Sequence, residues 1–185
     1  QRGDILQLVQ LANKNATEEA QRLTGKEEKY TGSVKLLEKM LGLEHLCRME
    51  AYDISNIGAE SITAGMVVYE NAKPLKSDYR LFKIKTVNGS PDDYSSMREA
   101  LKRRIRHLKE DTSGAFSVLP DLILLDGGKG HVSVVKEVLA EEGVDIPVFG
   151  MVKDDFHKTR ALCTDTQEIN IAKDRAVFVL VYSIQ

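Results

Sequence analysis

Two aspartates end apolar runs that have the character of buried strands. Asp53 closes the string MEAYD, and Asp126 closes DLILLD. If the two strands are parallel neighbours, they lie about 4.8 Å apart, and both carboxylates reach the same edge of the sheet. Two carboxylates at that distance repel each other unless a cation neutralises them. The pair therefore predicts a site for a hard divalent ion, Mg²⁺ or Mn²⁺, because these ions prefer oxygen ligands.

The ligands of such a site are those of metal-assisted phosphodiester hydrolysis. Mg²⁺ takes one or two protein carboxylates and fills its other positions with water or substrate phosphate, and it stabilises charge on the phosphate that is cleaved. Gly127 and Gly128 have no Cβ, so a sugar-phosphate backbone can approach closely, and Lys129 can meet a phosphate. The alternative is that Asp126 is only a turn residue, as Asp before Gly-Gly often is. The string DGGKGH lacks P-loop spacing, so it gives no nucleotide site.

The elements that must position these aspartates form an α/β pattern. Three strand-like runs at residues 48–56, 61–71 and 78–87 predict an antiparallel meander. A helix, a strand ending at Asp126, a helix over about 130–142 and a further strand follow, which predicts parallel crossovers. With the fourth strand beside the first, the order of strands reverses between them, and open sheets bind ligands at such a point. The predicted fold is a mixed sheet flanked by helices.

The helix after the meander carries both acidic and basic candidates. Ser90 as N-cap, Pro91 at the first helical position and Asp93 as a capping-box acid mark its start. Asp93 is expected to cap the helix, although an acid at this edge can also reach the metal. The buried face is predicted to consist of Met97, Leu101, Ile105 and Leu108.

Basic residues of the same helix form a candidate nucleic-acid surface. Arg98, Lys102, Arg106 and Lys109 follow one stripe, and Arg103 and Arg104 flank the apolar face. A run of this kind is usually a solvated face, and its alternative function is phosphate binding. The full set predicted to contact nucleic acid is Arg103, Arg104, Arg106, Lys129, His157 and Arg160. As a single loop histidine, His157 is a base, a phosphate contact or neither.

The N-terminal residues 1–45 are predicted to form a helical arm. Apolar residues recur at helical spacing from Ile5 to Leu23, and a second helical pattern runs from Val34 to Leu41. The polar string TGKEEKYTG separates them, and Gly42 is a C-cap candidate.

Composition limits the class of protein. With 185 residues, 42% of them hydrophobic, the chain can bury one sizeable core. Cys47 and Cys163 form no zinc or disulfide pattern, which predicts a reducing, cytoplasmic setting. No apolar run spans a bilayer and no signal peptide is recognisable, so no membrane association is expected. A net charge of -2 means that any nucleic acid must bind a local patch.

Four strings in this order resemble a known family. The segment from EAYDISNIGAESITAGMVVYEN through SPDDYSSMREALKRR, then PDLILLDGGKGH and MVKDDFHKTR, is similar to the endonuclease half of UvrC, a component of the excinuclease ABC of bacterial nucleotide excision repair. The arm RGDILQLVQLANKNA resembles the helical segment before that half. The resemblance implies an RNase H-like fold over residues 46–185 and a nick on the 5′ side of a lesion in double-stranded DNA. It also implies the UvrB component of excinuclease ABC as a partner and no small-molecule cofactor.

The resemblance carries roles to particular residues. Asp53 and Asp126 match the catalytic, metal-binding aspartates of the family, and Asp93 matches a further carboxylate of the same chemistry. In the family, the helix that begins like DRAVFVLVYSIQ continues into a histidine of the site, whereas this sequence stops at Gln185. The resemblance therefore implies a domain truncated at its last helix that is weakly active or inactive alone. The alternative is an RNase H-like module that binds nucleic acid or protein without cutting.

Overall fold

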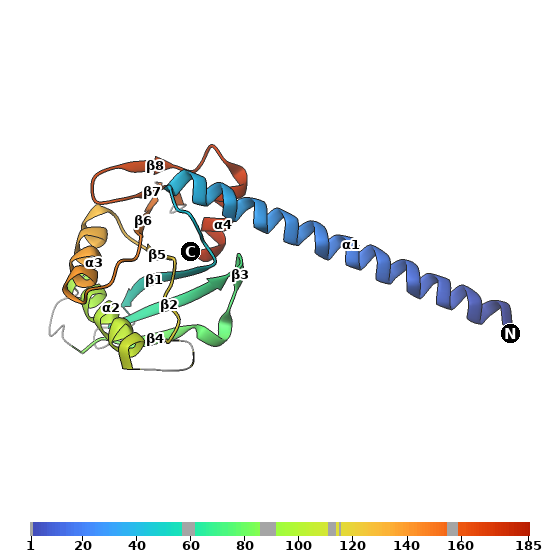
Figure 1. Cartoon of the computed structure of the whole chain (residues 1–185), viewed down its shortest axis with the longest axis horizontal. Coiled ribbons are helices and arrows are strands. Elements are labelled where there is room, and N and C mark those ends of the chain that lie inside the picture. The colour runs from blue at the N-terminus through green and yellow to red at the C-terminus, as the bar shows by residue number, and fades with distance from the viewer. Residues whose placement is uncertain (1, 57–61, 86–91, 111–113, 115, 155–158) are drawn as a thin grey trace.

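A computed structural model describes the chain except residues 1, 57–61, 86–91, 111–113, 115 and 155–158. Side chains of residues 2–12, 24, 26 and 27 are also outside the description. The described residues form a mixed sheet with helices on both faces and a long helix that projects from it (Figure 1). This arrangement confirms the α/β class and the mixed sheet predicted from the sequence. The division of the chain at residue 45 stays a prediction.

The sheet has the order β3-β2-β1-β5-β6-β7-β8, and β4 also pairs with β2. Strands β1 and β5 are parallel, as are β5 and β6, and the other pairings are antiparallel. The strands are β1 (Arg48–Asn56), β2 (Ile62–Glu70), β3 (Lys73–Pro74), β4 (Arg80–Lys83), β5 (Leu122–Leu125), β6 (Val148–Lys153), β7 (Thr159–Cys163) and β8 (Glu168–Asn170). The prediction that the strand ending at Asp126 lies beside the first strand is confirmed.

Two apolar layers enclose the sheet. Helices α2 (Asp93–Glu110) and α3 (Lys129–Glu141) cover one face, where they pack on alternate strand residues such as Tyr52 and Leu125. The end of α1 (Arg2–Leu41) and α4 (Arg175–Ile184) cover the other face, over residues such as Ala51 and Leu124. Because side chains alternate along a strand, the buried apolar residues of the strands divide between the two layers.

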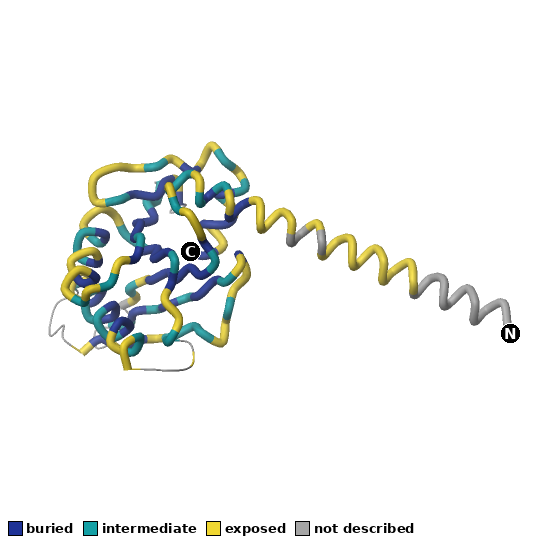
Figure 2. The backbone as a smooth tube through the Cα atoms, viewed as in Figure 1, coloured by how far each residue is buried: buried dark blue, intermediate teal, exposed yellow. Residues whose placement is uncertain are grey.

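Helix α1 is one continuous helix, so the prediction of two helices was wrong. The polar string between the two apolar patterns is rich in Lys and Glu, which are good helix formers, and a helix-interior glycine such as Gly25 or Gly32 costs only about 1 kcal/mol relative to alanine. The last turns of α1 pack on the domain through Val34 and Leu37 (Figure 2). Gly42, at φ 68°, ends the helix as predicted. No helix in the described part of the chain has the length and apolar content needed to cross a membrane.

Helix α2 starts at a different cap from the predicted one. Ser90 and Pro91 lie outside the described residues, and the helix begins at Asp93. Asp92 is the acid that caps it, because its carboxylate accepts the Ser95 hydroxyl at 2.5 Å and the Ser95 amide at 3.1 Å. These bonds, the hydroxyl first, lower the pKa of Asp92. The predicted buried face is confirmed at Met97, Leu101 and Ile105, with Leu108 partly buried.

Candidate active site

Strands β1 and β5 bring Asp53 and Asp126 side by side. Tyr52 is paired with Leu125 in the parallel register, and the Asp126 amide donates to the Tyr52 carbonyl at 2.8 Å. Asp53 and Asp126 directly follow Tyr52 and Leu125. The backbones at these two aspartates are therefore about one strand spacing, 4.8 Å, apart. Asp53 is exposed and its carboxylate accepts the Ser55 hydroxyl at 2.8 Å. The convergence predicted from the sequence is therefore present in the structure.

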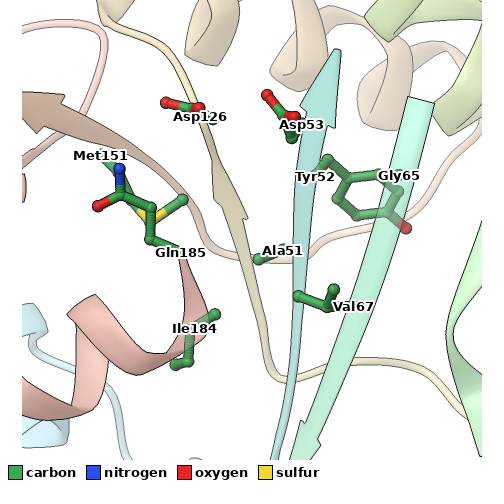
Figure 3. Close-up of a pocket in the computed structure, with 9 residues that line it drawn as sticks. All are labelled: Ala51, Tyr52, Asp53, Gly65, Val67, Asp126, Met151, Ile184 and Gln185. Atoms are coloured by element: carbon green, nitrogen blue, oxygen red, sulfur yellow. The ribbon is translucent and has the colours of Figure 1, made fainter. Parts of the chain in front are cut away.

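Both carboxylates lie on the face of the sheet that α4 covers. They line a pocket of about 200 Å³. The rest of its lining is Ala51, Tyr52, Gly65, Val67, Met151, Ile184 and Gln185. Figure 3 shows the two carboxylates near the carboxyl ends of neighbouring strands, with Ile184 and Gln185 approaching from the end of α4. The pocket is thus acidic at the sheet edge and mostly apolar below it.

Lys153 completes the charged edge, and the sequence analysis did not select it. It is the last residue of β6, the strand next to β5, and its ammonium lies 2.6 Å from the Asp126 carboxylate. Lys153 shares the face of Met151 because the two are alternate residues of β6. The position of Lys153 at the end of an apolar strand, like that of the two aspartates, was the signal available in the sequence.

The glycines after Asp126 serve different purposes. A Cβ on Gly127 would lie 2.4 Å from the His131 ring, so the space at Gly127 is filled by this ring and not left for a ligand. Gly128 is open, with nothing within 4 Å of such an atom. On β6, a Cβ on Gly150 would lie 2.3 Å from the Gly127 carbonyl oxygen. The missing Cβ atoms of Gly127 and Gly150 therefore leave room for other parts of the protein and not for a ligand backbone.

Asp93 lies at the start of α2 and does not line the pocket of Asp53 and Asp126. It is exposed. The next residue, Tyr94, packs against His131 with ring centroids 4.6 Å apart and the ring planes tilted by 35°, so the start of α2 sits beside the start of α3. Asp93 thus lies next to a residue that contacts the start of α3, while its part in the chemistry stays a prediction.

Arg104 is buried, so its predicted role in binding nucleic acid was wrong. Its side chain is 1% exposed and lies 2.8 Å from the buried carboxylate of Glu50. The guanidinium also donates to the carbonyls of Phe116 and Val118 at 2.9 and 2.7 Å. Although burial alone lowers the pKa of Arg104, the bonds and charge of Glu50 outweigh it and the pKa is raised. Arg104 therefore joins α2 to the sheet.

Glu50 is the acceptor of a buried network that sequence reasoning missed. It also accepts the Tyr52 hydroxyl at 2.7 Å. Burial, followed by the neighbouring Glu50 charge, raises the pKa of Tyr52 well above its usual value. Glu50 and Tyr52 point to the α2 face while Asp53 points to the opposite face, so this network fixes β1 from behind the site.

The basic stripe of α2 is neutralised by α3. Arg98 lies 2.6 Å from Glu137 and 2.7 Å from Glu141. Lys102 and Lys109 form 2.7 Å pairs with Glu141 and Glu142. Hydrogen bonds from Lys102 and then Arg98 lower the pKa of Glu141, and a hydrogen bond from Lys109 lowers that of Glu142. Three of the four stripe residues, Arg98, Lys102 and Lys109, therefore join the two helices and are not free to bind phosphate.

The other basic candidates differ in their surroundings. Arg103 donates to the Lys83 carbonyl and pairs with Glu99, while Arg106 is exposed. Lys129 is exposed and donates to the Thr166 carbonyl at 3.2 Å, and Arg160 pairs with Glu168 at 3.2 Å. His157 lies outside the described residues. Helix α2 packs on the face opposite the pocket, so Arg103 and Arg106 do not line it.

The donor set of the site suits one kind of metal ion. Across the described ranges, no group of three or more His, Cys, Asp or Glu side chains is placed to hold a metal. Asp53 and Asp126 alone do not make a closed tetrahedral zinc site, which takes four ligands. Two carboxylates at an accessible edge fit Mg²⁺ or Mn²⁺, because such ions keep several positions for water or phosphate oxygens.

The antiparallel β1 and β2 followed by parallel β5 and β6, with aspartates on adjacent strands, define an RNase H-like domain. The family model described as the UvrC RNAse H endonuclease domain matches residues 38–185. The chain belongs to this family, and the resemblance read from the sequence is confirmed.

Curated relatives extend the match to the whole chain. The UvrABC system protein C of Lachnospira eligens is 47% identical over 193 residues, covering 100% of this chain and 31% of the relative. That of Clostridium novyi is 46% identical over 194 residues, covering 98% of this chain and 31% of the relative. The chain thus spans about a third of the length of these relatives.

Solved structures of other proteins resemble the chain more distantly. A Ciona intestinalis endonuclease V in complex with DNA containing an inosine aligns with a TM-score of 0.43 and 15% identity, covering 66% of this chain and 59% of that one. Human endonuclease V aligns with a TM-score of 0.42 and 13% identity, covering 68% of this chain and 67% of that one.

Proposed function

We propose that this chain is the metal-dependent endonuclease domain that makes the 5′ incision in bacterial nucleotide excision repair. The observation that carries the proposal is the register that puts Asp53 and Asp126 side by side on one face of the sheet. The substrate is damaged double-stranded DNA, the UvrB component of excinuclease ABC presents it, and the setting is the cytoplasm. The curated relatives, named UvrABC system protein C, support these partners.

Each residue of the site has a role in this proposal. Asp53 and Asp126 hold Mg²⁺ or Mn²⁺, which when bound activates water and stabilises charge on the phosphate under attack. Asp93 supplies a further carboxylate at the same end of the sheet. Lys129, Arg160, Arg106 and Arg103 are the basic residues left to contact DNA phosphates, with His157 as an additional candidate. No small-molecule cofactor is involved.

The alternative of a binding module that does not cut DNA is less consistent with the site. A surface that only binds nucleic acid gains from positive charge, whereas the pocket edge carries two carboxylates. Two acids on adjacent strands repel a phosphate unless cations accompany them. The catalytic proposal explains why these acids are there.

The two described carboxylates also set an expectation for the 185-residue chain alone. An octahedral ion held by Asp53 and Asp126 must fill its other positions with water or substrate. We therefore expect weak metal binding and little cleavage by this chain without DNA-presenting partners. Mn²⁺ is expected to bind somewhat more tightly than Mg²⁺ to the same oxygen ligands.

The decisive experiment is incision of a lesion-bearing duplex by the longer UvrC-type protein that contains this domain, assayed together with its UvrB partner. Asp126→Asn keeps the shape of the side chain and removes its charge, so 5′ incision should fall by about a hundredfold or more. Asp165→Asn is the matched control, because Asp165 pairs with Lys136 and does not line the pocket. Equal loss in both variants, or none in Asp126→Asn, contradicts the proposal.

A further inference from the structure

Lys153 is placed where a cation is costly for metal binding and of little use for stability. Its ammonium lies 2.6 Å from Asp126, one of the two acids at the sheet edge. The side chains are 31% and 22% exposed, and solvent that reaches a partly exposed ion pair reduces its contribution to folding. A cation at this position also competes with a metal ion for the same carboxylate.

The balance of charges at the site indicates a function for the Lys153 ammonium. The two aspartates and one phosphodiester carry three negative charges, and a divalent ion supplies two positive ones. Lys153 supplies the third, from the end of β6, where its ammonium pairs with Asp126. An ammonium has three N–H donors, so it can keep one bond to Asp126 and give another to a phosphate oxygen.

The pocket offers few other donors for that oxygen. Ala51, Val67, Met151 and Ile184 present apolar side chains to it. The Gln185 amide oxygen accepts the Thr159 hydroxyl, and its NH2 group is a donor without charge. Among the described residues near the two aspartates, Lys153 is therefore the best placed cation for the phosphate that is cleaved.

We infer that Lys153 is a substrate-binding residue of the active site. Without substrate it neutralises Asp126 and limits the repulsion between Asp126 and Asp53. With substrate it donates to a non-bridging oxygen of the scissile phosphate and stabilises the charge that develops there. This inference rests on the proposed function, because it assumes a phosphodiester substrate at Asp53 and Asp126.

The inference gives two effects of opposite sign. The Lys153 ammonium repels a divalent ion bound about 5 Å away. Removing this charge should therefore tighten metal binding on the order of tenfold, if the repulsion is as weak as in water. The same change removes a contact to the phosphate, so incision should fall about a hundredfold. A residue that merely supports the fold would weaken metal binding and incision together.

The test compares three variants with the parent protein. Lys153→Met removes the charge, Lys153→Arg keeps it, and Lys136→Met breaks the 2.6 Å pair with Asp165 as a matched control. Mn²⁺ affinity is measured on the 185-residue chain by calorimetry, and 5′ incision on the longer protein with its UvrB partner. We expect tighter Mn²⁺ binding with less incision for Lys153→Met, partial recovery for Lys153→Arg, and no change for Lys136→Met.

Three results separate the possibilities. Lys153→Met with unchanged incision, or with weaker Mn²⁺ binding, overturns the inference. If Lys153→Met does not fold, Lys153→Gln, which keeps a donor to Asp126 but has no charge, must show the same opposed effects. If Asp126→Asn also leaves incision unchanged, the proposed function itself fails, whereas loss in Asp126→Asn alone refutes only the role of Lys153.

Discussion

Replacing Arg104 by methionine tests the buried connection between α2 and the sheet. The variant removes a guanidinium that is 1% exposed and leaves the Glu50 carboxylate, which is fully buried, without its 2.8 Å partner. Breaking one side of a buried ion pair typically costs 3–5 kcal/mol. The Tyr52 hydroxyl still donates to Glu50 at 2.7 Å and the Arg48 guanidinium stays 3.6 Å from it, so we expect a loss of about 3 kcal/mol, at the lower end of that range.

Urea unfolding followed by circular dichroism measures this loss as a shift in midpoint. Arg98→Met is the control on the same helix, because Arg98 is 33% exposed and its partners Glu137 and Glu141 are 63% and 47% exposed. Exposed pairs of this kind contribute at most about 1 kcal/mol. In thermal unfolding, 3 kcal/mol corresponds to a decrease in Tm of roughly 6–12 °C for a protein of this size.

The result that refutes the reasoning is an Arg104→Met variant no less stable than Arg98→Met. A second variant separates pairing from packing. In Glu50→Gln combined with Arg104→Met, the buried negative charge is gone, the amide oxygen can still accept the Tyr52 hydroxyl and Arg48 keeps its 2.9 Å pair with Asp78, so much of the lost stability should return. If the double variant is as unstable as Arg104→Met, the loss comes from packing and the ion-pair account is wrong.

Three further outcomes follow from local contacts. Gly150→Ala should cost about 1–3 kcal/mol because its Cβ would lie 2.3 Å from the Gly127 carbonyl oxygen, while Gly128→Ala, at an open position, should cost little in the same urea assay. Asp174→Ala should lower the free energy of unfolding by about 1 kcal/mol, because the Asp174 carboxylate accepts hydrogen bonds from two backbone amides at the start of α4. Asp174→Asn should keep most of this stability, because asparagine also caps helices. Burial, followed by a neighbouring negative charge, raises the pKa of Tyr52. The stability that this group contributes is complete below its unfolded pKa near 10 and is lost as the pH rises towards the folded value. Tyr52→Phe should therefore lose stability less steeply above about pH 10, and parallel curves for the two proteins would exclude this linkage.

The sequence predicted the features that depend on local pattern. Alternation along the strands and the order of elements predicted that Asp53 and Asp126 meet, which the register confirms. The burial of Arg104 was also readable in principle, because it lies three residues after Leu101 and seven after Met97, on the apolar face. Its partner Glu50 is 54 residues away, and only the folded arrangement of α2 on β1 selects that acid.

Other features of the fold and the site could not be predicted from local sequence pattern. The hairpin of β7 and β8 was not predicted, because its strands are short and pair at the edge of the sheet. The polar segment in α1 was expected to break the helix, but its charged residues favour the helix more than its glycines oppose it. Lys153 needed knowledge that β6 lies next to β5, because only then does its charge meet Asp126.

The ion pairs between α2 and α3 affect how fast a duplex can be found. Fields of clustered charge speed diffusional encounter by factors of 10–1000, but the Arg98, Lys102 and Lys109 charges are cancelled within a few ångströms by acids of α3. With a net charge of -2, the domain has little long-range attraction for DNA. On the proposed function, its encounter rate with free duplex is then slow and only weakly dependent on salt. On the same proposal, delivery of DNA by a partner that already holds it would replace diffusional search.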